Sequence, residues 1–109
     1  NQLPLLQVQG NAESDTLLIG WGSTEGHLHA AANQLGCALA HFNYIHPLPK
    51  NTEKVLCQYK RLIVCELNSG QFAGYLRSKT TGLTFEQYNE MTAQPFAVDR
   101  IVAAVKNKN

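Results

Sequence analysis

The residues with the clearest chemical potential form the segment Gly20-Trp21-Gly22-Ser23-Thr24. Glycines let the backbone come close to a ligand phosphate, a partner subunit or the first turn of a helix. Together with Gly26 they read G-x-G-x-x-x-G, one residue longer than the dinucleotide-binding fingerprint. No acidic residue ends the next apolar stretch to bind a ribose hydroxyl, so the sequence argues against a nicotinamide or flavin nucleotide site.

Neither the hydroxyls nor the histidines form a familiar catalytic or metal-binding set. The pattern around Ser23 is G-S-T rather than G-x-S-x-G, and no Asp and His pair follows to complete a triad, so a helix N-cap explains Ser23 and Thr24 better. His27 and His29 are two residues apart on a predicted helix, so they point about 200° apart and cannot share a metal ion. We expect no metal site, and we expect the histidines to be surface or packing residues.

Composition narrows the class of protein. The 109 residues, 44% of them hydrophobic, suffice for one domain with a single core. Nine basic and eight acidic residues leave a net charge of +1, and no basic cluster stands beside aromatic residues, so we expect neither nucleic acid nor a membrane as a partner. Cys37, Cys57 and Cys65 are odd in number and widely spaced, which favours reduced thiols in a cytoplasmic protein over disulfides or an iron–sulfur cluster.

Strand-like and helix-like stretches alternate along the chain. The predicted strands are 17–22, 38–45, 62–65 and 83–89, and the predicted helices are 24–35, about 52–59, 71–79 and 98–105. Gly36 and Gly82 are suited to end the first and third helices, and Asn51 or Thr52 can cap the second. The pattern predicts an α/β fold, a three-layer αβα sandwich with a mostly parallel sheet.

The only methionine is Met91, so we interpret the chain as a piece of a longer protein. Residues 1–16 are expected to be a lead-in segment from an upstream domain, and residues 17–109 are expected to form the domain itself.

Polar residues collect where the predicted strands end. Because open α/β sheets place ligands at the carboxyl ends of their strands, the segments 22–24, 46–49 and 66–71 are expected at one functional edge. Glu66 could face a second domain there, in which case its replacement would cost the isolated domain little stability. It could equally anchor its own loop through Asn68 and the nearby backbone.

Four strings resemble one protein family: LLIGWGSTEG, YIHPLP, LIVCELNSGQFAGYLR and QPF before the closing helix. They are similar to the C-terminal transketolase-like domain of the α subunit of 2-oxoacid:ferredoxin oxidoreductases, most of all the 2-oxoglutarate type. The resemblance runs from about Val8 to Val105. The family motifs G-W-G-S-T-x-G, L-x-P-L-P and E-x-N-x-G-Q are matched at Gly20 to Thr24, Gly26, Leu48, Pro49, Glu66, Asn68, Gly70 and Gln71. Ala93 stands where the family usually has a glycine.

The resemblance implies a thiamine-diphosphate enzyme that decarboxylates 2-oxoglutarate, passes electrons through iron–sulfur centres to ferredoxin and forms succinyl-CoA. It also implies that thiamine diphosphate, magnesium and the clusters lie elsewhere in the complex, so that this domain alone is inactive and has no catalytic or cofactor-binding residue. Domains of this type pack against catalytic domains and other subunits. The resemblance therefore implies a docking surface, here called the rim, made of Gly22, Ser23, Thr24, Pro49, Glu66, Asn68, Gly70 and Gln71.

Alternatives remain within and outside this family. The domain could be the equivalent part of a transketolase, a pyruvate dehydrogenase E1 β subunit or a pyruvate:ferredoxin oxidoreductase. From another class, it could be a free-standing nucleotide-binding module that uses Gly20 to Gly26.

Overall fold

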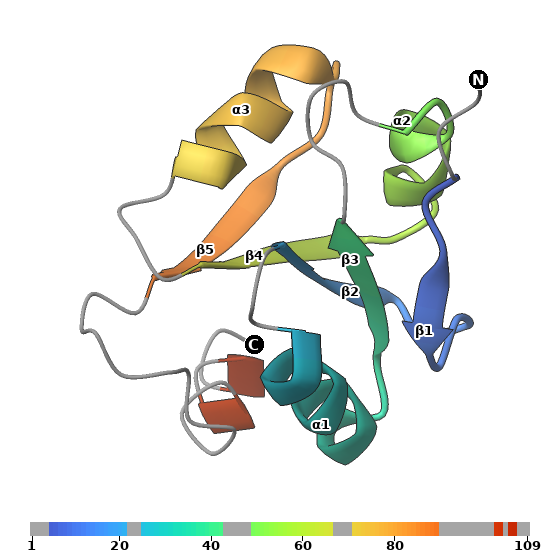
Figure 1. Ribbon diagram of the computed structural model, residues 1–109, viewed down its shortest axis with the longest axis vertical. Coiled ribbons are helices and arrows are strands. Elements are labelled where there is room, and N and C mark those ends of the chain that lie inside the picture. Colours follow the sequence, from blue (N-terminus) through green and yellow to red (C-terminus); the bar gives the residue numbers. More distant parts are fainter. Residues whose placement is uncertain are drawn as a thin grey trace.

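A computed structural model describes residues 5–21, 25–42, 49–66, 71–89, 102–103 and 105–106 of the chain (Figure 1). The strands are β1 (Val8–Gly10), β2 (Thr16–Trp21), β3 (Ala38–Phe42), β4 (Arg61–Glu66) and β5 (Phe85–Asn89), and the helices are α1 (Glu25–Leu35), α2 (Thr52–Leu56) and α3 (Gln71–Lys79). None of the helices in these ranges is long and apolar enough to cross a membrane.

The five strands form one sheet in the order β1-β3-β2-β4-β5. β2 lies parallel to β3 and β4, β4 lies parallel to β5, and only β1 is antiparallel to its neighbour β3. The prediction of an α/β fold with a mostly parallel sheet is confirmed.

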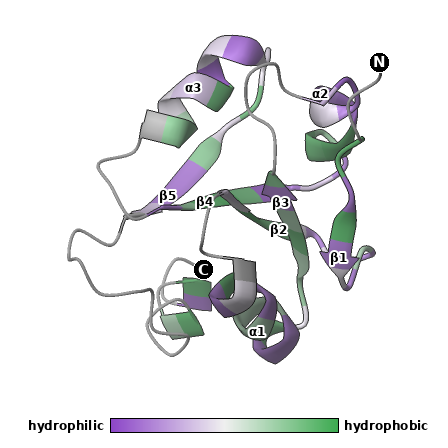
Figure 2. Ribbon diagram, viewed as in Figure 1, coloured by the Kyte–Doolittle hydropathy of each residue, from purple (hydrophilic) through white to green (hydrophobic). Residues whose placement is uncertain are grey.

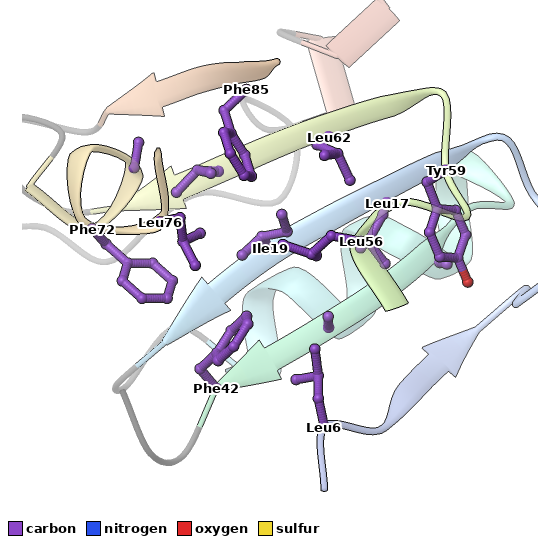
Figure 3. Close-up of a cluster of buried hydrophobic side chains, with 14 residues drawn as sticks. Leu6, Leu17, Ile19, Phe42, Leu56, Tyr59, Leu62, Phe72, Leu76 and Phe85 are labelled. Carbon is purple, nitrogen blue, oxygen red and sulfur yellow. The ribbon is translucent and has the colours of Figure 1, made fainter. Parts of the chain in front are cut away.

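The central strands are apolar because both faces of the sheet are covered. On one face, Leu17 and Ile19 of β2 pack with residues of α2 and α3 such as Leu56 and Leu76 (Figure 3). On the other face, Leu18 packs with α1 and with Val105 near the end of the chain. Hydrophobic residues accordingly concentrate on the central strands in Figure 2, and the three layers are α2 with α3, the sheet, and α1 with the closing segment.

Gly36 ends α1 as predicted. Its φ of +69° lies in the left-handed region that glycine adopts without strain, and the N–H of Cys37 then donates to the carbonyl of Ala32 at 3.0 Å. The buried face of the helix includes Leu28, Ala31 and Ala32, whose spacing places them on one side of the helix.

The second helix differs from its prediction in length and capping. It ends at Leu56 instead of Tyr59, and no side chain caps its N-terminus. The Asn51 amide is engaged elsewhere, since its Oδ1 accepts from the N–H of Leu6 at 2.8 Å and its Nδ2 donates to the Leu6 carbonyl at 2.9 Å. The hydroxyl of Thr52 donates to the carbonyl of Pro49 at 2.7 Å. The capping prediction is therefore wrong, because the Asn51 side chain bonds to distant Leu6 and the Thr52 hydroxyl bonds to the preceding Pro49 carbonyl.

Within the described residues, the predicted strands and the closing helix are present, with small differences in their bounds. β5 begins two residues later than the predicted strand 83–89, and β3 is described only to Phe42, so residues 43–45 of that prediction lie outside the described residues. Of the predicted helix 98–105, residues 102, 103 and 105 are described and are helical, with Val105 buried.

The lead-in segment contributes a strand that the sequence analysis did not assign. β1 pairs with β3, and Leu6 just before it is buried in the core. Gly10 ends the strand with a φ of +74°, and a Cβ at this position would lie 2.7 Å from the carbonyl oxygen of Cys37. The close approach of two backbones explains why this position is a glycine.

Candidate functional site

The carboxyl ends of β2, β3 and β4 meet at one edge of the sheet. Trp21 at the end of β2 is level with Phe42 at the end of β3. The last residue of β4 paired with β2 is Val64, opposite Ile19, and β4 runs two residues further to end at Glu66. Glu66 therefore lies at the same edge as the two aromatic residues.

Glu66 connects β4 to the beginning of α3. Its side chain is buried, with 2% exposed, and its two carboxylate oxygens accept hydrogen bonds from the N–H groups of Phe72 and Ala73, each at 2.9 Å. The first N–H groups of a helix have no partner within the helix, and the positive end of the helix dipole favours a negative charge there. Of the two roles left open by the sequence, the geometry supports that of an anchor for the nearby backbone, here the N-terminus of α3.

Three aromatic rings pack behind this edge. The ring centroids of Trp21 and Phe72 are 5.7 Å apart, and those of Phe42 and Phe72 are 5.3 Å apart with an edge-to-face angle of 73°. Such tilted pairs are favourable for aromatic quadrupoles. Phe72 thus packs against Trp21 of β2 and Phe42 of β3, the latter seen in Figure 3, and its N–H donates to Glu66 of β4. These contacts fix the start of α3 over the edge.

Pro49, another residue of the predicted rim, bonds to the start of α2. It is buried, and its carbonyl accepts from both the N–H and the hydroxyl of Thr52, at 3.1 Å and 2.7 Å. This residue therefore shapes the beginning of α2. Five rim residues lie outside the described residues: Gly22, Ser23, Thr24, Asn68 and Gly70. Gln71 is the first residue of α3, and its side chain is not described.

The described part of this edge has no set of groups arranged for acid, base or nucleophilic chemistry. Both oxygens of Glu66 already accept backbone hydrogen bonds, so this carboxylate is not placed to take a proton from a substrate. No group of three or more His, Cys, Asp or Glu side chains that could hold a metal ion occurs within the described ranges.

The cysteines and histidines are explained by packing or exposure. All three cysteines are free thiols; Cys37 and Cys65 are buried, and Cys57 is exposed. Burial raises the pKa of Cys37 to about 11 and that of Cys65 to about 12, so these two thiols stay protonated and weakly nucleophilic at neutral pH. His41 is buried in β3, whereas His29 is exposed and lies 3.4 Å from Asn33, nitrogen to nitrogen. His46 lies outside the described residues.

Sequence reasoning missed two structural roles. The clustering of Trp21, Phe42 and Phe72 joins residues far apart in the chain, and no spacing rule predicts it. Asn51 was singled out as a helix cap, but its partner Leu6 is 45 residues away. The only signal in the sequence was the position of Asn51 just after the proline-rich segment 47–49, and this position does not point to Leu6 as the partner.

The geometry alone does not show to which proteins the chain is related, but comparison with known proteins does. No protein-family model matches the chain. The KorA subunit of the 2-oxoglutarate oxidoreductase of Mycobacterium tuberculosis is 40% identical over 83 residues, an alignment that covers 71% of this chain and 13% of that protein. The chain therefore spans a small part of this relative.

A solved structure has the same fold. The 2-oxoglutarate:ferredoxin oxidoreductase from Magnetococcus marinus, with 2-oxoglutarate, coenzyme A and succinyl-CoA bound, matches with a TM-score of 0.86 and 26% identity. The match covers 97% of this chain and 20% of that one. Sequence and fold together show that this chain is homologous to one domain of the 2-oxoglutarate:ferredoxin oxidoreductases.

Proposed function

We propose that the chain is the C-terminal, transketolase-like domain of the α subunit of a 2-oxoglutarate:ferredoxin oxidoreductase, and that it serves domain docking and subunit assembly. The complex would oxidatively decarboxylate 2-oxoglutarate, transfer the acyl group to coenzyme A and pass the electrons to ferredoxin. The partners of this chain would be the other domains and subunits of that enzyme, in the cytoplasm.

The observation that carries this proposal is the match of nearly the whole chain to one part of a much longer oxidoreductase chain. Such a match is what an accessory domain of a larger enzyme is expected to produce. The site geometry agrees, because the buried carboxylate at the edge is bonded to the chain's own backbone.

The residues present do not fit the enzyme's cofactors. The magnesium ion that holds the diphosphate of thiamine diphosphate requires clustered oxygen ligands, and iron–sulfur clusters require several thiolates. The described residues offer no such cluster, and burial raises the pKa values of the two buried cysteines, Cys37 and Cys65. We therefore assign thiamine diphosphate, magnesium and the iron–sulfur clusters to other parts of the complex.

Within the rim, two kinds of residue have different roles in this proposal. Glu66 and Pro49 fix the edge internally, through their bonds to α3 and to Thr52. The polar residues Asn68 and Gln71 would contact the second domain. Loss of such a contact leaves a buried partner unsatisfied, at a cost of about 1–3 kcal/mol, which corresponds to about 5- to 150-fold weaker association.

The docking role is tested in the full-length protein with its partner subunits. Asn68→Ala combined with Gln71→Ala should shift the complex toward free subunits in gel filtration. Gln58→Ala is the matched control, since Gln58 is an exposed amide just after α2. Assembly of the double variant at wild-type concentrations would contradict the docking role of these residues.

A second experiment separates this proposal from a nucleotide-binding module. The 109-residue chain, assayed with 2-oxoglutarate, thiamine diphosphate, magnesium, coenzyme A and a viologen acceptor, should show no turnover above buffer. The same chain titrated with adenine nucleotides should show no saturable binding. Nucleotide binding that disappears in a Gly22→Val variant would favour the alternative module that uses Gly20 to Gly26.

A further inference from the structure

A cavity lies at the edge of the sheet opposite the rim, where β2 and β4 begin. Its volume is about 260 Å³, and it is lined by Ser14, Thr16, Leu35, Cys37, Arg61, Val105 and Lys106. α1 and the closing segment, which lie side by side on one face of the sheet in Figure 1, form its outer walls. The proposed docking role does not use this cavity.

Arg61 is held rigidly in the wall of the cavity. Its Nε donates to Glu86 Oε2 at 2.8 Å, and its Nη2 donates to Glu86 Oε1 at 3.1 Å and to the carbonyl of Val105 at 3.0 Å. A guanidinium that such hydrogen bonds hold in place presents its positive charge without further loss of side-chain entropy. Glu86 offsets part of that charge but is not itself a lining residue.

The other polar lining residues can donate hydrogen bonds. Ser14 Oγ accepts from the N–H of Thr16 at 3.1 Å, so the hydroxyl hydrogen of Ser14 can be donated to a ligand. The hydroxyl of Thr16 and the ammonium of exposed Lys106 supply further donors. None of the described residues that line the cavity is acidic, and the Cys37 thiol, whose pKa burial raises to about 11, is neutral at pH 7.

Backbone carbonyls near the cavity already have donors. The carbonyl of Ala32 accepts from the N–H of Cys37, and the carbonyl of Gly36 accepts from Asn11 Nδ2 at 3.2 Å. Val105 is bonded to Arg61 as described. The partial negative charge expected at the end of α1 is therefore partly compensated, which leaves an excess of donors and positive charge around the cavity.

We propose that this cavity binds a small tetrahedral oxyanion of the phosphate type. The Nε–Nη2 edge of Arg61, which would bind a planar carboxylate in a bidentate manner, is occupied by Glu86. The donors of Ser14, Thr16 and Lys106 come from separate parts of the chain and suit an anion that accepts from several directions. The volume is below the roughly 300–1,000 Å³ of pockets for drug-sized ligands, so the ligand is an ion or the phosphate end of a larger molecule.

The test is an NMR titration of the full chain with inorganic phosphate at constant ionic strength. Saturable shifts should appear at residues 14–16, 37 and 61. Thr16→Val and Lys106→Met should each weaken phosphate binding about tenfold, as expected for loss of one charge-assisted hydrogen bond. Lys54→Met is the matched control, because Lys54 is an exposed lysine on α2, across the sheet from the cavity, and should leave binding unchanged.

Two further arms identify the ligand and keep the test decisive. Ribose 5-phosphate that saturates the same residues more tightly than phosphate would assign the cavity to a phosphomonoester. Lys106→Met alters an exposed side chain, so it decides the outcome even where Thr16→Val does not fold. The proposal is overturned if no saturable shift occurs at residues 14–16, if Lys106→Met binds phosphate as well as Lys54→Met does, or if succinate binds there more tightly than phosphate.

Discussion

Replacement of Glu66 by alanine is expected to destabilise the domain strongly, even in the absence of any partner. The side chain is 2% exposed and accepts two backbone hydrogen bonds at 2.9 Å from the first turn of α3. Without the carboxylate, the N–H groups of Phe72 and Ala73 are left without an acceptor in a buried environment. This geometry reverses the earlier expectation that the replacement would cost the isolated domain little.

The magnitude follows from the two hydrogen bonds. A hydrogen bond to a charged group contributes about 1.5–3 kcal/mol, so Glu66→Ala should lower the free energy of unfolding by about 3–6 kcal/mol. For a domain of this size, a loss of that order lowers the melting temperature by roughly 10–25 °C. Glu66→Gln keeps one acceptor oxygen and should lose about half as much.

Urea denaturation of the 109-residue chain and its variants measures this loss. Trp21, the single tryptophan, lies 5.7 Å from Phe72, so its fluorescence reports on this edge while circular dichroism reports on the whole fold. Glu53→Ala is the matched control, because the exposed Glu53 carboxylate also accepts one backbone N–H, that of Thr81, at 3.2 Å. If Glu66→Ala and Glu53→Ala lower the free energy of unfolding equally, the anchoring role of Glu66 is refuted.

Three further predictions concern the backbone and the thiols. Gly10→Ala and Gly36→Ala both place a side chain at positive φ, which should lower the free energy of unfolding by about 1–2 kcal/mol. Only Gly10→Ala also brings a Cβ to 2.7 Å from the Cys37 carbonyl oxygen, so urea denaturation should show this variant to be less stable by about another 1–3 kcal/mol. Equal stabilities of the two variants would contradict the close backbone approach. At pH 8, a thiol reagent should label Cys57 rapidly and the two buried cysteines only upon unfolding. Because the folded pKa values of Cys37 and Cys65 are raised from 9.0 to about 11 and 12, their contribution to stability is complete below pH 9 and is lost as the pH rises toward 11–12. If Cys65→Ala loses as much stability over this pH range as the wild type does, the contribution of the Cys65 thiol is contradicted.

Local signals in the sequence predicted the parts of the fold that depend on neighbouring residues. Gly36 was identified as the end of α1 because a positive φ after an apolar helical stripe is a local property. The central strands were identified because strands covered on both faces are continuously apolar. In contrast, Val8–Gly10 is too short to show a pattern, and its strand exists only because β3 pairs with it.

The role of Glu66 shows where such reasoning ends. The sequence placed this carboxylate at the end of a strand, which is correct. Whether it faced a partner or its own backbone depended on N–H groups six and seven residues later, whose position is set by the packing of Phe72 on Phe42 and Trp21. Tyr59 illustrates the same limit. It was expected within the second helix but lies beyond α2, where it is buried and its hydroxyl donates to the carbonyl of Ala12.

The proposed assignment to a 2-oxoglutarate:ferredoxin oxidoreductase is tested most directly by an activity assay. The complex to assay is the one that copurifies with the full-length protein from its native source. The quantity to measure is coenzyme A-dependent reduction of a viologen acceptor with 2-oxoglutarate, compared with pyruvate as substrate. We predict turnover that requires coenzyme A and prefers 2-oxoglutarate. A purified complex that reduces the acceptor with pyruvate but not with 2-oxoglutarate, or with neither substrate, would contradict the proposal.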